Sequence, residues 1–200
     1  MKAFFWAVSI GFAQRDKVCE RERVGIVKKL EEYVKSIPDF PKPGIIFRDV
    51  TSILQDPEGL KLSIHELMKR LEGVEFDVIA GAEARGFLFG MPLAYNKSKA
   101  FVPIRKKGKL PRETISEEYA LEYGTATIEM HKDAIFPGQR VVLIDDLLAT
   151  GGTAAATIRM IERLGGKVVK LLFVMELAGL EGRKELEGYD VDSVIVYPGK

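Results

Sequence analysis

The chain has 200 residues, of which 46% are hydrophobic and 30% are charged, and its formal net charge is +1. These values are ordinary for a globular protein with one sizeable core, and the near-neutral charge gives no electrostatic reason to expect a nucleic-acid or membrane partner. The single Cys19 excludes a framework of internal disulfides, so we expect a reducing, cytoplasmic setting.

The N-terminus differs in character from the rest of the chain. Residues 3–13, AFFWAVSIGFA, are largely apolar but too few to span a bilayer. The run could be an export signal, a segment that packs on the body or on another subunit, or an extension from a misplaced start codon. We favour the last interpretation and expect a single domain over residues 24–200, with residues 1–23 as a non-native or disordered extension.

Two helices are predicted in the first part of that domain. Apolar residues at helical spacing indicate an amphipathic helix that ends at Pro38; these are Val27, Leu30, Val34 and Ile37. An irregular segment rich in proline and glycine leads into a short extended stretch before residue 54. Asp56 and Pro57 are then typical of an N-cap and a first helical residue, and Gly73 ends this second helix.

Strands and helices alternate in the remainder of the chain. Residues 76–90 predict a strand, a turn and a helix that starts near Phe87. Further strands are expected at 100–106, 125–130, 141–144 and 167–177, with a helix at 153–164 between the last two. This order predicts an α/β fold with a doubly wound, mostly parallel sheet, in which ligands bind beyond the carboxyl ends of the strands. Residues 105–124 are dense in charge without a clear period, which is typical of a functional lid or a disordered linker.

The sequence VVLIDDLLATGGT at 141–153 carries the strongest chemical signal. A buried strand runs into Asp145 and Asp146, which have no basic residue beside them in the sequence. Small and hydroxyl residues then lead into a helix N-terminus, where unpaired N–H groups bind phosphate; these are Ala149, Thr150, Gly151, Gly152 and Thr153. The carboxylates suit sugar hydroxyls or Mg²⁺. The implied ligand is a sugar phosphate.

Better-known nucleotide motifs are missing from the sequence. There is no G-x-G-x-x-G, and the glycines at 81 and 86 have Walker spacing but are followed by Phe87 and Leu88 instead of Lys and Ser or Thr. A dehydrogenase and an ATPase are therefore disfavoured.

The 141–153 stretch resembles the phosphoribosyl-pyrophosphate (PRPP) motif of type I phosphoribosyltransferases. Three further segments resemble the adenine phosphoribosyltransferase family: 38-PDFPKPGIIFRDVT-51, 80-AGAEARGFLFG-90 and 103-PIRKKGKLPRETISEEYALEYGT-125. The resemblance runs from about Val24 to the C-terminus. It implies the type I fold with a flexible lid and a small N-terminal hood, and the reaction of adenine with PRPP to give AMP and pyrophosphate. It also implies Mg²⁺ and a homodimer.

The same resemblance implies roles for individual residues. Asp145 and Asp146 would hold the ribose hydroxyls and stabilise positive charge on the ring, while residues 149–153 would bind phosphate. Arg85 would bind the leaving pyrophosphate, and Glu122 would be the acid/base. The other implied substrate-binding residues are Ile46, Phe47 and Arg48 for adenine, Arg105, Lys106 and Lys109 for added positive charge, also across a dimer interface, and Tyr123. The metal would be held mainly by PRPP and pyrophosphate.

Two alternatives remain open at this point. A phosphoribosyltransferase for guanine, hypoxanthine or xanthine would share the 141–153 motif but should lack the PDFPKPGIIFRD segment. A PRPP-sensing regulator that binds nucleic acid would need a basic face and a DNA-binding appendage. The chain is instead nearly neutral, and its sequence has no room for a winged helix.

Overall fold

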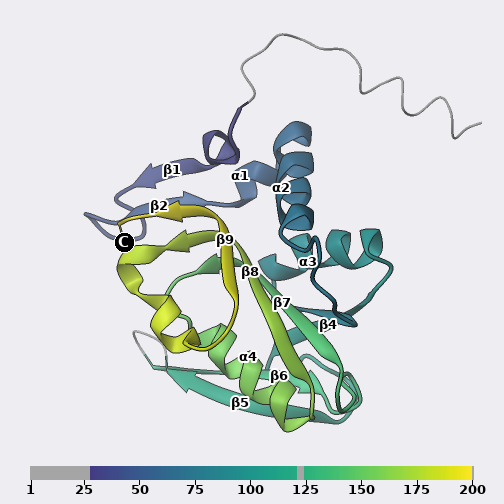
Figure 1. Ribbon diagram of the computed structural model, residues 1–200. Helices are drawn as coiled ribbons and strands as arrows, with labels where there is room; N and C mark the ends of the chain where they lie inside the picture. The colour runs from purple at the N-terminus through teal and green to yellow at the C-terminus, as the bar shows by residue number, and fades with distance from the viewer. Residues whose placement is uncertain (1–27, 121–123, 200) are drawn as a thin grey trace, which may run out of the picture.

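The computed structural model describes residues 28–120 and 124–199 (Figure 1). Its main sheet has seven strands in the order β5-β6-β4-β3-β7-β8-β9. The strands are β3 (Val78–Ala82), β4 (Ala100–Lys106), β5 (Thr114–Ala120), β6 (Thr125–His131), β7 (Arg140–Leu148), β8 (Lys167–Leu177) and β9 (Val191–Tyr197). Neighbours from β4 through β9 are parallel, whereas β6 pairs antiparallel with both β4 and β5. The α/β class with a mostly parallel sheet is confirmed.

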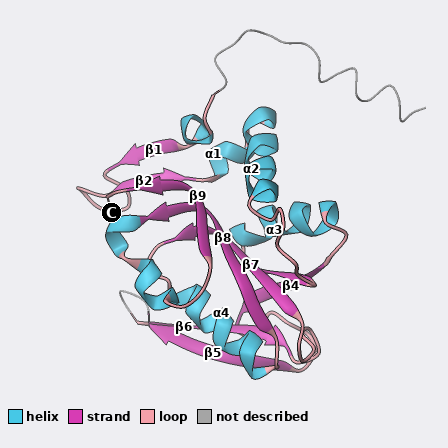
Figure 2. Ribbon diagram, viewed as in Figure 1, coloured by secondary structure: helices cyan, strands magenta, loops and turns pink. Residues whose placement is uncertain are grey.

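Helices cover both faces of this sheet (Figure 2). They are α1 (Thr51–Leu54), α2 (Pro57–Lys69), α3 (Arg85–Asn96) and α4 (Gly152–Arg163). Along β7, Val141 and Leu143 pack into the core beneath α4, whereas Val142 and Ile144 pack into the core shared with α1, α2 and α3. Because side chains alternate along a strand, an unbroken apolar run fills both cores, as expected for a doubly covered strand. No helix in the described residues is long and apolar enough to cross a membrane.

The predicted start of α2 is confirmed. The side chain of Asp56 accepts hydrogen bonds from the backbone N–H groups of Glu58 and Gly59, at 2.8 and 3.2 Å, and Pro57 is the first helical residue. An N-cap acceptor of this kind satisfies donors that have no partner within the helix. The helix itself ends at Lys69, a few residues before Gly73.

The predicted helix before Pro38 is wrong over its described part. Leu30–Tyr33 forms one turn of 3₁₀ helix, and Lys35–Pro38 forms strand β1, which pairs antiparallel with β2 (Ile46–Asp49). Ile37 lies opposite Phe47 in this two-stranded sheet. Pairing with β2 gives the backbone N–H and C=O groups of β1 the hydrogen-bond partners that a helix would otherwise give them. Within residues 28–38 only Leu30 is buried. The β1–β2 sheet is the small hood, above the main sheet in Figure 1.

The charged segment 105–124 contains a strand that the sequence analysis did not predict. Residues Thr114–Ala120 form β5, which pairs with β6 along its whole length. On its inner side, Glu117 pairs with Arg159 and Arg163 of α4 at 2.7 and 2.8 Å. The negative charge of Glu117, which made a strand look improbable from the sequence, is thus neutralised by two arginines 42 and 46 residues further along the chain.

Candidate active site

The acidic pair lies near the carboxyl end of β7, where open α/β sheets bind their ligands. Asp146 is only 5% exposed, and its backbone N–H donates to Oδ1 of Asp145 at 2.9 Å. Burial raises the pKa of Asp145 well above its ordinary value, and the adjacent carboxylate of Asp146 raises it further. Burial also raises the pKa of Asp146, although the charge of Arg85 opposes that shift.

Arg85 supplies the counter-charge that the sequence around the pair lacks. It is the first residue of α3, and its Nε lies 2.7 Å from Oδ2 of Asp146. That oxygen is buried and accepts no aligned hydrogen bond, so the contact is an attraction between charges with hydrogen-bonding capacity left over. The Arg85 side chain is 42% exposed and faces open space as well as the acid. It can therefore interact with an anion beside Asp146.

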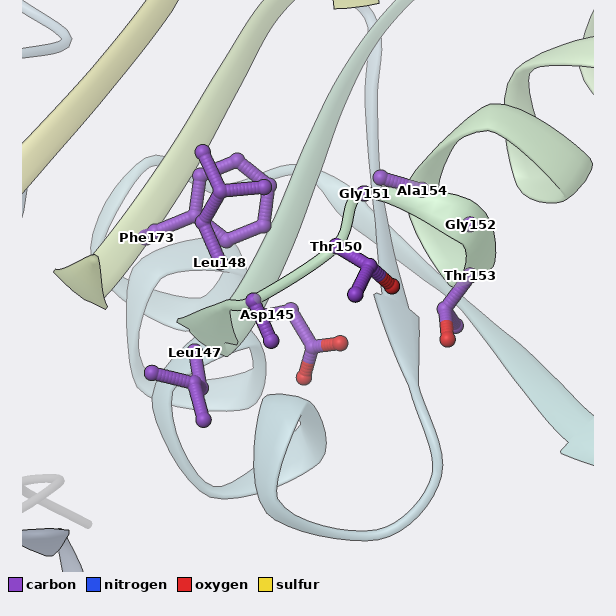
Figure 3. Close-up of a pocket in the computed structure, with 10 residues that line it drawn as sticks. Asp145, Leu147, Leu148, Thr150, Gly151, Gly152, Thr153, Ala154 and Phe173 are labelled. Carbon is purple, nitrogen blue, oxygen red and sulfur yellow. The ribbon is translucent and has the colours of Figure 1, made fainter. Parts of the chain in front are cut away.

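The turn after β7 encloses a hollow of about 60 Å³ at the N-terminus of α4 (Figure 3). Every residue from Ala149 to Thr153 lines it, together with Asp145, Leu147, Leu148, Ala154 and Phe173. Gly151 caps the helix with φ of 85°, a left-handed conformation that favours glycine. In Figure 3 the Asp145 carboxylate and the hydroxyls of Thr150 and Thr153 lie on one side of the turn. This hollow has room for a small anion and too little for a nucleotide.

A second cavity, of about 310 Å³, lies between the hood and the main sheet. The hood contributes Gly44, Ile45, Ile46, Phe47 and Arg48; the rest of the wall is Arg85, Asp146, Leu147, Leu177 and Leu180. Phe40 packs edge-to-face on Phe47, and the guanidinium of Arg48 lies 4.2 Å from the centre of the Tyr197 ring on β9. An apolar cavity of this size with a few polar groups is typical of a small-molecule site.

A third cavity, of about 380 Å³, lies on the other side of Arg85 and Asp146. Its lining is Ala82, Glu83, Ala84, Arg85, Lys106, Tyr119, Ala126, Ile128, Asp145, Asp146, Leu147 and Thr153. Arg85 and Asp146 line this cavity and the hood cavity, while Asp145 and Thr153 line this cavity and the hollow at the N-terminus of α4. The three spaces therefore meet at the acidic pair.

Comparison with known proteins shows the family to which the chain belongs. Residues 49–197 match the family model of the phosphoribosyl transferase domain. A curated adenine phosphoribosyltransferase from Lachnoclostridium phytofermentans is 67% identical over 87% of this chain and 100% of its own length. The chain belongs to the adenine phosphoribosyltransferase family. The family, the enzyme class and the adenine phosphoribosyltransferase activity that the four motifs indicated are thereby confirmed.

Solved adenine phosphoribosyltransferases have the same fold. The enzyme from Thermoanaerobacter pseudethanolicus aligns with a TM-score of 0.81 and 56% identity, over 84% of this chain and 100% of its own. The enzyme from Saccharomyces cerevisiae aligns with a TM-score of 0.79 and 40% identity, over 82% of this chain and 96% of its own. The yeast structure is a complex with adenine and D-2,5-dideoxy-2,5-imino-altritol 1,6-bisphosphate.

The basic residues that the resemblance to adenine phosphoribosyltransferases assigned to substrate are only partly brought together. Lys106 lines the third cavity, whereas Arg105 and Lys109 line none of the three. Both of the latter are ion-paired to Glu83, with Arg105 Nε 3.1 Å from its Oε2. Glu122 and Tyr123 lie outside the described residues.

Several lining residues were missed by the sequence analysis. Leu177 at the end of β8 and Leu180 in the 3₁₀ turn that follows line the hood cavity, and nothing in their sequence context distinguishes them from core leucines. Tyr119 of β5 accepts a hydrogen bond from Thr153 Oγ1 at 3.1 Å, and its ring lies 3.2 Å from where a Cβ on Gly152 would stand. Glu83 lies within the 80–90 motif and also lines the third cavity, but the sequence alone indicates no role for it. Recognising β5 would have indicated Tyr119, because it lies on the same face as Ile115.

Proposed function

We propose that the three cavities bind the parts of one reacting complex, with the acidic pair at its centre. Adenine occupies the hood cavity against Ile46, Phe47 and Arg48. The 5-phosphate of PRPP occupies the hollow of residues 149–153, and its pyrophosphate occupies the third cavity beside Arg85 and Lys106. The observation that carries this proposal is that Asp145, Asp146 and Arg85 form walls shared between these spaces. The ribose then lies where base and leaving group can face opposite sides of one carbon.

In the proposed reaction the bond from C1′ of the ribose to a pyrophosphate oxygen breaks, and a bond from C1′ to N9 of adenine forms. Loss of the leaving group builds positive charge on the ribose ring, as in glycoside cleavage. Asp145 and Asp146 hold the ribose hydroxyls and place negative charge near that ring. Their raised pKa values in the free protein come from burial, and a cationic ring or metal beside them favours the ionised form.

The proton from N9 needs an acceptor, and we assign this role to Glu122, with Tyr123 beside it. The resemblance to the family supports the assignment, and the described part of the same segment reaches the site, since Tyr119 lines the third cavity. Glu122→Gln should slow the chemical step more than it weakens PRPP binding. Weaker binding with unchanged chemistry would assign Glu122 to binding instead.

Mg²⁺ is part of the proposal. A hard cation of this kind binds one or two carboxylates together with substrate phosphates, and Asp145 and Asp146 are the carboxylates that the site offers beside the sugar. The metal would be held mainly by PRPP and pyrophosphate oxygens and would neutralise phosphate charge. No group of three or more His, Cys, Asp or Glu side chains that could hold a metal ion is found among the described residues.

We also propose a homodimer that works in the cytoplasm. The outer face of α3 exposes Leu88, Met91 and Tyr95, at 46%, 51% and 84%, and their spacing places them on one side of the helix. An exposed apolar stripe on a helix that starts in the active site is a suitable surface for a second copy. Sedimentation of the purified protein as a single chain at its assay concentration would contradict the dimer. The cytoplasm is inferred from the lone Cys19 and from PRPP as substrate.

An assay with PRPP, Mg²⁺ and a panel of purines tests the function. Adenine should give AMP, and guanine, hypoxanthine and xanthine should react poorly. Asp145→Asn and Asp146→Asn should each lower kcat by about 10²–10³, the usual cost of removing a preorganised electrostatic partner. Asp133→Asn is the matched control, since Asp133 is an exposed aspartate ion-paired to Arg112 outside the cavities. Near-normal turnover in both active-site variants would refute the assigned role.

A further inference from the structure

Glu83 is a buried carboxylate in a cavity that we assign to an anion. Its side chain is only 11% exposed and lines the third cavity beside Arg85 and Lys106. The lining of that cavity includes three carboxyl groups, from Glu83, Asp145 and Asp146, and two cations, from Arg85 and Lys106. A diphosphate entering it therefore meets a carboxylate that the ribose chemistry does not need.

The contacts of Glu83 are the ones a diphosphate would make. Its Oε2 accepts from Arg105 Nε at 3.1 Å and from the backbone N–H of Lys106 at 3.2 Å, and its Oε1 accepts from Lys109 Nζ. Two cationic side chains and a backbone N–H at a strand end form a donor set that suits a phosphate group. In the free protein the carboxylate occupies that donor set.

The charge on Glu83 is present at neutral pH. Burial raises the pKa of this carboxyl, but the hydrogen bonds from Lys109, Arg105 and the Lys106 backbone outweigh burial and hold the pKa below its ordinary value. The turn that carries these donors is also fixed from the other side, because the backbone N–H of Gly108 donates to the buried Glu129. The backbone of the turn between Lys106 and Lys109 is thus held by a contact that does not involve Glu83.

We propose that Glu83 is an internal competitor for pyrophosphate. While Glu83 holds Arg105 and Lys109, these two side chains line none of the three cavities, and the product reaches them only by displacing the Glu83 carboxylate, so it binds weakly and leaves readily. The inference rests on the proposed placement of pyrophosphate in the third cavity. A product that binds through charge-assisted contacts dissociates slowly, and product release limits turnover in many enzymes. A carboxylate that returns to these donors as pyrophosphate leaves lowers the affinity for the product without touching the ribose.

The test is the affinity for magnesium pyrophosphate, measured by calorimetry in Glu83→Gln, Glu83→Asp and Arg85→Gln. Glutamine keeps an oxygen acceptor for Arg105 and Lys106 but removes the negative charge. The dissociation constant of Glu83→Gln should fall about tenfold, the order expected for removing one like charge near a multiply charged ligand at a partly exposed site. Glu83→Asp keeps the charge and should retain the wild-type constant.

The controls separate this inference from the proposed function. Glu58→Gln, which removes an exposed glutamate ion-paired to Lys61 on α2, should leave pyrophosphate binding unchanged. Arg85→Gln should weaken it. If Arg85→Gln weakens binding but Glu83→Gln does not strengthen it, Glu83 is only a support for the turn and the inference is wrong. If Arg85→Gln has no effect, the pyrophosphate placement fails and the inference fails with it.

Discussion

Gly182 is the residue at which a single added methyl group should disturb the hollow of residues 149–153, proposed above to bind the 5-phosphate, without touching substrate. It lies in a short 3₁₀ helix, Gly182–Leu186, that packs behind the turn after β7. A Cβ built on Gly182 would stand well under 3.0 Å from the carbonyl oxygen of Ala149 and 2.9 Å from Cδ1 of Leu148. We therefore expect Gly182→Ala to push the turn and the 3₁₀ helix apart.

The turn, rather than the 3₁₀ helix, is expected to move. The neighbouring Arg183 makes two hydrogen bonds of 2.8 Å to Glu176, which is 5% exposed and also accepts from Ser193 at 2.7 Å. This ion pair to a buried carboxylate fixes the 3₁₀ helix to β8 and β9. Relieving the overlap requires a shift of about 1 Å, since non-bonded carbon atoms settle at about 3.5–4.0 Å.

The magnitude follows from that shift. Overpacking of this kind destabilises a fold by about 1–3 kcal/mol, which a stable domain tolerates. A misplacement of about 1 Å in a substrate-positioning group costs about 10² in rate. We therefore expect kcat/KM for PRPP to fall about a hundredfold in a protein that remains folded at assay temperature.

The assay is initial-rate AMP formation with PRPP varied at saturating adenine, alongside thermal unfolding. Gly188→Ala is the matched control, because Gly188 has φ of 91° with nothing within 4 Å of an added Cβ. That substitution strains the backbone by about 1 kcal/mol without moving the turn, so it should lower stability and leave kcat/KM intact. A Gly182→Ala enzyme with wild-type kcat/KM, or one no more impaired than Gly188→Ala, would refute the reasoning.

Two further predictions concern strand β5 and the amino ends of the neighbouring strands β3 and β7. Tyr119→Phe removes the hydroxyl that accepts a hydrogen bond from Thr153. Loss of a hydrogen bond of about 1 kcal/mol should raise KM for PRPP about fivefold and leave kcat little changed. A fall in kcat at constant KM would place Tyr119 in the chemical step instead. Hydrogen bonds from the side chain and backbone of Arg140 lower the pKa of Asp77 to about 2. Because this folded-state pKa is below the unfolded value, the stabilisation is present above about pH 4 and is lost as the pH falls toward 2. In denaturant titrations the free-energy difference between wild type and Asp77→Asn should be constant near neutral pH and shrink below pH 4, and a difference that grows on acidification would contradict the assignment.

The sequence predicted those elements whose residues carry their own signal. The β7 run is apolar at every position because the strand is covered on both faces, and Asp56–Pro57 marks a helix start because its cap and first residue are adjacent. The 149–153 turn is recognisable for the same reason, since one continuous stretch provides every residue from acid to helix. Each of these signals comes from residues that are adjacent in the sequence, so it does not depend on how the rest of the chain folds.

Elements whose stability depends on distant partners were misassigned. Ile37 fits the spacing of an amphipathic helix, but in the structure it lies opposite Phe47 in the β1–β2 sheet, and this strand pairing outweighs the local helical pattern. Glu117 breaks the alternation of β5 between Ile115 and Tyr119, so the strand was read as an irregular lid. Arg159 and Arg163 of α4, which packs against β5, supply the positive charge that allows Glu117 on that face.

The sequence by itself determined the fold class and the family, and it carries the 141–153 motif on which the proposed sugar-phosphate site rests, because these residues are contiguous or lie in motifs. Only the tertiary structure decided how charge is balanced there. Asp146 of β7 has its counter-charge in Arg85 of α3, and Glu83 holds Arg105 and Lys109 from more than twenty residues away. The strength of an ion pair to a buried carboxylate depends on distance and desolvation, and neither is set until the chain has folded.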